Sequence, residues 1–96
     1  WNWVDATDAW TSSEHIHVGD SKKLIAGTGS DLQFYHDGTN SVLSNATGTF
    51  YYLADTQQFM DVAGGETQAK FVKDGAAELC HNSVKKIETT AAGVTP

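Results

Sequence analysis

The sequence predicts an all-β chain built from short strands and tight turns. Strand-length runs in which apolar and polar residues alternate recur along it, and glycines fall between the runs. No window carries the i, i+3, i+4, i+7 spacing of an amphipathic helix. The expected strands are Glu14–Val18, Lys22–Ala26, Asp31–His36, Ser41–Ser44, Thr49–Ala54, Gln57–Val62, Glu66–Lys73, Ala76–His81 and Val84–Thr89.

Alternation within these runs predicts which side chains share a face. Residues two apart in a strand point to the same side. We therefore expect one face to carry Leu32, Phe34 and His36, and a second strand to carry Ala69 and Phe71 on one side.

Two Asp-Gly pairs mark places where the chain should reverse direction. Asp37-Gly38 and Asp74-Gly75 stand between strand runs. Asp-Gly tolerates the positive φ that a primed turn requires, so we expect a hairpin at each pair.

Residues 1–13 differ in composition from residues 14–96, which form the β-repeat segment. We interpret 1–13 as a Trp-rich N-terminal arm or linker, either extended or with a short helical turn around Asp5 to Trp10. Aromatic side chains dominate interface energetics, which favours packing against a neighbouring chain. The alternative is an apolar plug on this same domain. The tryptophans are Trp1, Trp3 and Trp10.

The composition limits what the chain does by itself. Leu, Ile, Val and Phe number 19 of 96 residues, which is at the lower border for chains that bury their own core. A small domain with so few apolar residues gains most from oligomerisation. Because the chain begins at Trp1, we expect a segment of a longer protein.

Charge and cysteine usage exclude several classes of function. The net charge of −6 and six basic residues argue against a nucleic-acid partner, because phosphate binding needs clustered Lys and Arg. No apolar run approaches the roughly 20 residues of a membrane span, so no membrane insertion is expected. The single cysteine, Cys80, excludes an intrachain disulfide framework.

A weak internal repeat favours a structural rod over an enzyme. The segments Gly29–Phe50 and Asp74–Val94 share a short strand, a polar turn, a second strand, a Thr-rich step and a glycine. Such self-similarity is typical of quasi-one-dimensional β architectures. Each strand carries only two or three large apolar groups, which suits a trimer in which every chain forms one wall of a shared core. The interface candidates are Trp3, Trp10, Leu32, Phe34, Phe71 and Leu79.

The wording of the repeat resembles a known family. Residues 29–41 read GSDLQFYHDGTNS, residues 74–94 read DGAAELCHNSVKKIETTAAGV, and residues 10–16 read WTSSEHI. Together they resemble repeats of tail-fibre and other fibrous structural proteins of marine tailed bacteriophages, cyanophages among them. The resemblance covers roughly residues 10–95.

The resemblance implies a virion component in the tail or capsid fibre. The implied fold is an elongated trimeric β-fibre segment, either β-prism or similar to a triple-stranded β-helix. The implied role is a fibre shaft or receptor-binding region for host attachment. Its partners would be itself as a homotrimer, other virion proteins and a host cell-surface glycan, with no cofactor. A capsid-attached head fibre or decoration protein is the alternative, and a glycan-depolymerising fibre domain is a further one.

His15 and His17 are candidate metal ligands. In a strand both imidazoles would share a face, and threefold symmetry would offer six nitrogens to one iron or similar metal on the axis. The alternative is a solvent-exposed strand face with Ile16 buried.

No constellation of residues predicts catalysis, and we expect no enzyme. His36-Asp37 stands at a turn entry, where turn chemistry accounts for the aspartate. The aromatic residues Phe50-Tyr51-Tyr52 with Phe34-Tyr35 offer either a stacking platform for sugars or rings that fill the core and the seams between chains.

Overall fold

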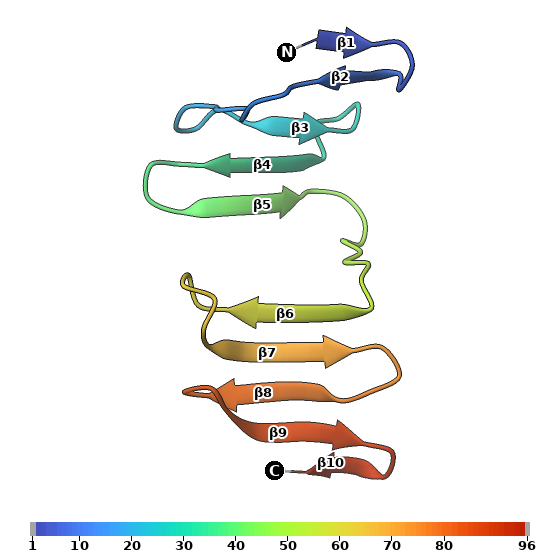
Figure 1. The fold of residues 1–96 in the computed structure, drawn as a ribbon, viewed down its shortest axis with the longest axis vertical. Helices are drawn as coiled ribbons and strands as arrows, with labels where there is room; N and C mark the ends of the chain where they lie inside the picture. The colour runs from blue at the N-terminus through green and yellow to red at the C-terminus, as the bar shows by residue number, and fades with distance from the viewer. Residues whose placement is uncertain (1, 96) are drawn as a thin grey trace. The chain divides into compact units, whose positions relative to one another are not determined.

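The structure is a computed structural model and describes residues 2–95. These residues form ten strands in three antiparallel sheets and no helix, which confirms the predicted all-β class (Figure 1). Within the described range, no helix is long and apolar enough to cross a bilayer.

Contacts divide the chain into two units, Trp1–Phe50 and Tyr51–Pro96. The first unit holds two sheets. A two-stranded sheet lies within the segment expected to be an arm, and a three-stranded sheet of order β3-β4-β5 follows it (Figure 1). The strands of the first unit are β1 (Asn2–Val4), β2 (Ala9–Thr11), β3 (Leu24–Ala26), β4 (Leu32–His36) and β5 (Ser41–Asn45).

The second unit holds one five-stranded sheet of order β10-β9-β8-β7-β6. Each strand pairs with the next along the chain, so the sheet is a continuous meander (Figure 1). One extra residue interrupts the pairing near Phe59/Met60 and another near Leu79/Cys80, as β-bulges do. The strands are β6 (Thr56–Met60), β7 (Thr67–Val72), β8 (Ala77–His81), β9 (Val84–Thr90) and β10 (Gly93–Thr95).

The expected helical turn in the first residues is wrong, because the chain forms the β1–β2 hairpin there. Trp3 lies opposite Trp10 and Val4 lies opposite Ala9. The loop between them reverses by way of Asp8, whose φ is 51°. Four-residue hairpin loops of this kind are common, and Asp is among the residues that tolerate a positive φ.

Two expected strands do not form. Glu14–Val18 has no partner strand, and the hydroxyl of Ser12 both accepts from the Glu14 N–H at 3.1 Å and donates to the Glu14 carbonyl at 2.7 Å. This local bonding offers the backbone an alternative to a sheet ladder. Thr49–Ala54 also forms no strand, and the Gln57 side-chain amide donates to the Tyr52 carbonyl there.

The hairpin predicted at Asp37-Gly38 forms, and Gly38 has the expected positive φ, at 100°. His36 lies opposite Ser41, which leaves a four-residue loop. The carboxylate of Asp37 accepts from the backbone N–H of Thr39 at 2.9 Å and of Asn40 at 2.7 Å. Both hydrogen bonds lower the pKa of Asp37, and the bond from the Asn40 N–H has the larger effect. An Asx turn therefore closes this loop.

The turn at Asp74-Gly75 joins β7 and β8 but is not a primed two-residue turn. At Asp74-Gly75 the positive φ belongs to Asp74, at 57°. A primed two-residue turn with both central φ values positive occurs one hairpin later, at Asn82 (52°) and Ser83 (65°) between β8 and β9. The two repeated segments thus share a hairpin and differ in loop length.

The sheets are single layers. Among residues 2–95 no side chain, apolar or polar, is fully buried. A single antiparallel sheet normally places one face against a core. The apolar face of each sheet is therefore the one expected to be covered.

Candidate self-association surface and a histidine-lined hollow

An apolar row crosses the sheet of the second unit. Phe59, Ala69, Leu79 and Ile87 lie directly opposite one another from β6 to β9, so their side chains share one face. Phe71 shares this face and meets Phe59 edge to face, with ring centroids 6.3 Å apart. We call these five residues the apolar ladder.

Most of the ladder is accessible to solvent. The exposed fractions are 55% for Phe59, 50% for Leu79 and 44% for Ile87. Nothing within residues 51–95 covers them. Burial of their remaining exposed area against another apolar surface would lower the free energy.

The other face of the same sheet is mainly polar, although Met60 and Val72 also lie on it. Gln58, Lys70, Glu78 and Glu88 lie opposite one another across β6 to β9. Lys85 Nζ contacts Glu88 Oε2 at 2.7 Å, and this hydrogen bond raises the pKa of Lys85. This face is the one suited to water.

The three-stranded sheet of the first unit also carries an apolar row on one face. Leu24, Phe34 and Leu43 lie opposite one another on one face, with exposed fractions of 53%, 56% and 45%. The other face is mixed. It carries Ile25 and Val42 together with Gln33 and Tyr35, and the Tyr35 ring lies 4.7 Å from Lys23 Nζ. The predicted alternation of β4 is confirmed by this register.

The β1–β2 hairpin carries a third apolar pair. The Trp3 and Trp10 rings meet edge to face at 5.7 Å and 73°. The indole N–H of Trp3 donates to Asp5 Oδ1 at 2.7 Å. Both rings remain largely exposed, at 46% and 60%.

Each of the three sheets carries two of the six predicted interface residues, and the two residues share one face of their sheet. This placement agrees with a shared-core role, which stays a prediction. Sequence reasoning missed Phe59 and Ile87, because their membership of the ladder depends on cross-strand register. The pairs are Trp3 with Trp10, Leu32 with Phe34, and Phe71 with Leu79.

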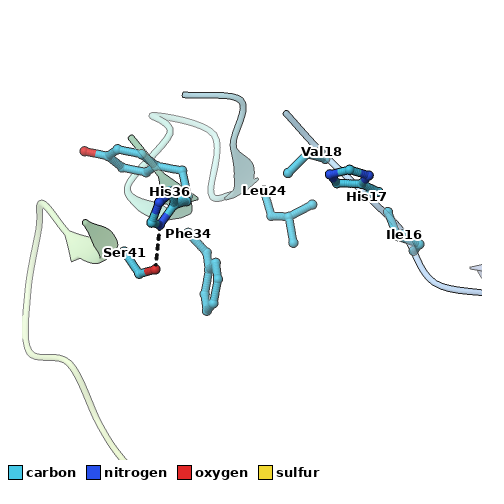
Figure 2. A pocket seen from close by; sticks show the side chains of 8 residues that line it. Ile16, His17, Val18, Leu24, Phe34, His36 and Ser41 are labelled. Carbon is cyan, nitrogen blue, oxygen red and sulfur yellow. Dashed lines mark hydrogen bonds between the residues drawn. The ribbon is translucent and has the colours of Figure 1, made fainter. Parts of the chain in front are cut away.

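A shallow hollow opens beside the apolar face of the first unit (Figure 2). Its volume is about 240 Å³. His36 lies at its edge, where Nδ1 is 3.0 Å from Ser41 Oγ. The lining residues are Ile16, His17, Val18, Leu24, Phe34, Tyr35, His36 and Ser41.

The His36–Ser41 pair is a single contact between an imidazole and a hydroxyl. A serine nucleophile needs a base that a third group orients and donors for an oxyanion. Within residues 2–95, no hydrogen bond joins an acidic side chain to His36. The pair orients the imidazole on the surface.

The structure removes the spacing argument for a metal site at His15 and His17. Their segment is not a strand, so spacing no longer places both imidazoles on one face. His17 instead lines the hollow. In the part of the chain that is described, no group of three or more His, Cys, Asp or Glu is placed to hold a metal ion. A site shared among symmetry-related copies stays a prediction.

The suggested aromatic platform cannot include both residues of β4. Phe34 and Tyr35 are adjacent in the strand and lie on opposite faces. Tyr51 and Tyr52 lie in irregular chain, with exposed fractions of 75% and 60%. Cys80 points to the polar face, away from Leu79, and its thiol is half-buried.

Comparisons with known proteins identify no relative: no protein family, no curated protein and no solved structure matches this chain.

Proposed function

We propose that this chain is a structural segment of a bacteriophage fibre, in a tail-fibre shaft or its receptor-binding region, and that it acts as a homotrimer. The observation that carries the proposal is that each sheet is a single layer with one half-exposed apolar face. A chain of this kind gains stability chiefly from other copies of itself. The resemblance of the repeats supplies the fibre context.

The exposed area supports a second copy as the occupant of these faces. The chain exposes 7912 Å² at a mass of 10.3 kDa. Two separate compact units of half that mass would together expose about 6,500 Å². The excess of about 1,400 Å² per chain exceeds the roughly 800 Å² per partner that a stable interface buries.

The chemistry of the faces also suits self-association. The apolar ladder and the Leu24–Phe34–Leu43 row carry no charged side chain. In the sheet of the second unit, Glu78, Glu88 and Lys70 occupy the face opposite the ladder. Three copies would therefore place apolar groups inside and charged groups outside. Threefold repetition would also multiply a weak affinity for host glycan.

Light scattering across a dilution series tests the association. We expect a mass of about three times 10.3 kDa over the whole series. A cooperatively folded monomer at every concentration would overturn the proposal. Antibody labelling of intact virions then tests the fibre role and separates a tail position from a capsid position.

A further inference from the structure

The two outer strands of the three-stranded sheet each have a free edge. β3 and β5 lie on either side of β4, and among residues 2–95 both pair only with β4 (Figure 1). Exposed edges are usually protected by charged side chains, proline or bulges. β5 has no charged residue, no proline and no bulge. Lys23 precedes β3, but its ammonium group lies over the Tyr35 ring of its own sheet. Both edges are therefore open to pairing with another chain.

One hydrogen bond shows which residues of β5 present their backbone groups to the free edge. The Ala46 N–H donates to the Asp31 carbonyl at 2.9 Å, which makes position 46 a bonded position of the β4–β5 pair. Bonded and non-bonded positions alternate along an antiparallel pair, so Ser44 also bonds to β4. The N–H and carbonyl groups of Leu43 and Asn45 therefore point to the free edge.

The same alternation assigns the free edge of β3. Because Gln33 of β4 lies opposite Ser44 and bonds to β5, its neighbour Phe34 bonds to β3, where its partner is Leu24. The next residue of β3, Ile25, therefore turns its N–H and carbonyl groups outward.

Threefold symmetry decides which edges can meet. A strand that pairs with its own copy makes a two-fold contact, so in a homotrimer the β5 edge of one copy must meet a different edge, that of β3, in the next. β3 and β5 run in the same direction, since each is antiparallel to β4. Around an axis that follows the strands, β5 of one copy and β3 of the next are therefore parallel.

Parallel pairing keeps the apolar faces of neighbouring copies on one side. In a parallel pair, a residue that bonds across the pair lies opposite one that does not. Ile25 would therefore lie opposite Val42 or Ser44, which already share its face of the sheet. Leu24 and Leu43 then stay together on the other face.

The mixed face of the sheet supplies the register. Its two large aliphatic residues, Ile25 and Val42, belong to the two edge strands, and Gln33 and Tyr35 separate them within one chain. Ile25 is 52% exposed. With Ile25 of one copy opposite Val42 of the next, each side chain covers the other, and β-branched cross-strand neighbours pack well on a sheet.

We propose that in the homotrimer the free edge of β5 pairs in parallel with β3 of a second copy, with Ile25 opposite Val42, so that three sheets of three strands close into one sheet of nine. This inference rests on the proposed function and assigns its shared core to a particular backbone pairing. The Ile25 N–H then donates to the Ser41 carbonyl, and the Leu43 N–H donates to the Ile25 carbonyl. A closed sheet of about eight strands has an interior that side chains just fill. The Leu24–Phe34–Leu43 rows of the three copies face this interior.

Amide hydrogen exchange of the wild-type protein tests the pairing, at a concentration at which light scattering gives the mass of a trimer. The Ser44 amide bonds to β4 with or without the second copy and serves as the internal reference. The amides of Leu43 and Ile25 should exchange within about tenfold of the Ser44 rate, because each must first break a ladder bond. Faster exchange of either amide in a trimer would overturn the pairing and leave the proposed function in place. A monomer at every concentration would overturn both.

A disulfide between copies tests the register. Within one chain, residues 25 and 42 lie two strands apart, roughly 9–10 Å, which exceeds the ~7 Å that a disulfide spans. In a Cys80→Ser background, Ile25→Cys/Val42→Cys should therefore give covalent dimers and trimers on a denaturing gel without reductant. Ile25→Cys/Ser41→Cys is the matched control and should stay monomeric on the gel, because Ser41 lies on the opposite face. No cross-link in the first pair, or equal cross-linking of both pairs, would overturn the proposed pairing.

Discussion

Leu79 lies directly opposite Ile87 across β8 and β9, and both side chains are about half exposed on the same face. The residues that precede and follow them on the other face are polar or charged. Leu79 and Ile87 form the centre of the apolar ladder. In the isolated chain about half of their apolar area stays in contact with water, which is unfavourable.

Leu79→Lys should break the trimer. Covering the exposed half of a leucine is worth about 1 kcal/mol per copy, and the introduced charge opposes burial further. Over three copies, about 3 kcal/mol weakens the trimer equilibrium constant roughly a hundredfold, and because the dissociation midpoint of a trimer varies as the square root of this constant, the midpoint should rise roughly tenfold. Light scattering at a fixed series of concentrations measures the shift.

Gln58→Lys provides the matched control, since Gln58 belongs to the polar face of the same sheet. It should change the midpoint less than threefold. Equal effects of the two lysines would show that the ladder is not the association surface.

Alternation within β4 and β7 was readable from sequence because the side-chain period of a strand is fixed by its geometry. The register between strands was not, since it depends on loop lengths. Asp37 closes a loop that leaves four residues between His36 and Ser41, and this register aligns Phe34 with Leu43.

Glu14–Val18 shows a different limit of sequence reasoning. Its residues alternate as a strand would, but a strand also needs a partner, and the Ser12 hydroxyl occupies both backbone groups of Glu14. The candidate surface was predicted in part. Its aromatic and leucine members stood out by size, while Phe59 and Ile87 required cross-strand pairing to be recognised.

Trp10→Ala should remove the edge-to-face ring pair and loosen the β1–β2 hairpin. Isolated two-stranded hairpins are marginal in water, and an aromatic pair adds about 0.5–1.5 kcal/mol beyond area burial. Two indoles 5.7 Å apart should also couple in circular dichroism, and this signal should vanish in the variant. Asp5→Asn keeps an acceptor for the Trp3 indole, so this variant should retain the coupled circular dichroism signal. If the signal disappears in Asp5→Asn as well, Asp5 rather than the ring pair holds the hairpin.

Ser83→Gly should stabilise the chain by about 0.5–1 kcal/mol, because Ser83 has a φ of 65° and glycine carries no penalty there. Asn-Gly is also the preferred sequence of the primed turn. Urea unfolding measures the change. Ser83→Ala removes the hydroxyl but keeps the Cβ, so it should not stabilise; a gain in both variants would assign the effect to the hydroxyl instead.

Gly27→Ala and Gly48→Ala separate backbone strain from a steric clash. Both glycines have positive φ, at 99° and 81°, so each substitution costs about 1–2 kcal/mol from the backbone. A Cβ at residue 48 meets open space, whereas one at residue 27 lies 2.7 Å from Asp31 Oδ2. Relief of that clash requires the Asp31 carboxylate to shift, which disturbs the 3.2 Å hydrogen bond that its Oδ1 accepts from the Thr47 hydroxyl. We therefore expect the larger loss of unfolding free energy for Gly27→Ala, and equal losses would mean that Asp31 moves freely.

Asp37 should contribute to acid sensitivity, and the sign follows from the direction of its pKa. Backbone N–H groups of Asn40 and Thr39 lower the folded-state pKa below the ordinary 3.8. The stability that this carboxylate provides is therefore present above pH 3.8 and is lost as the pH falls through the folded-state pKa. Asp37→Asn keeps a side-chain oxygen for both N–H groups but does not titrate. Between pH 4.5 and pH 2.5 the melting temperature of the wild type should fall more steeply than that of the variant. Parallel curves would show that the charge on Asp37 does not stabilise the loop, and that the side-chain oxygen alone holds Thr39 and Asn40.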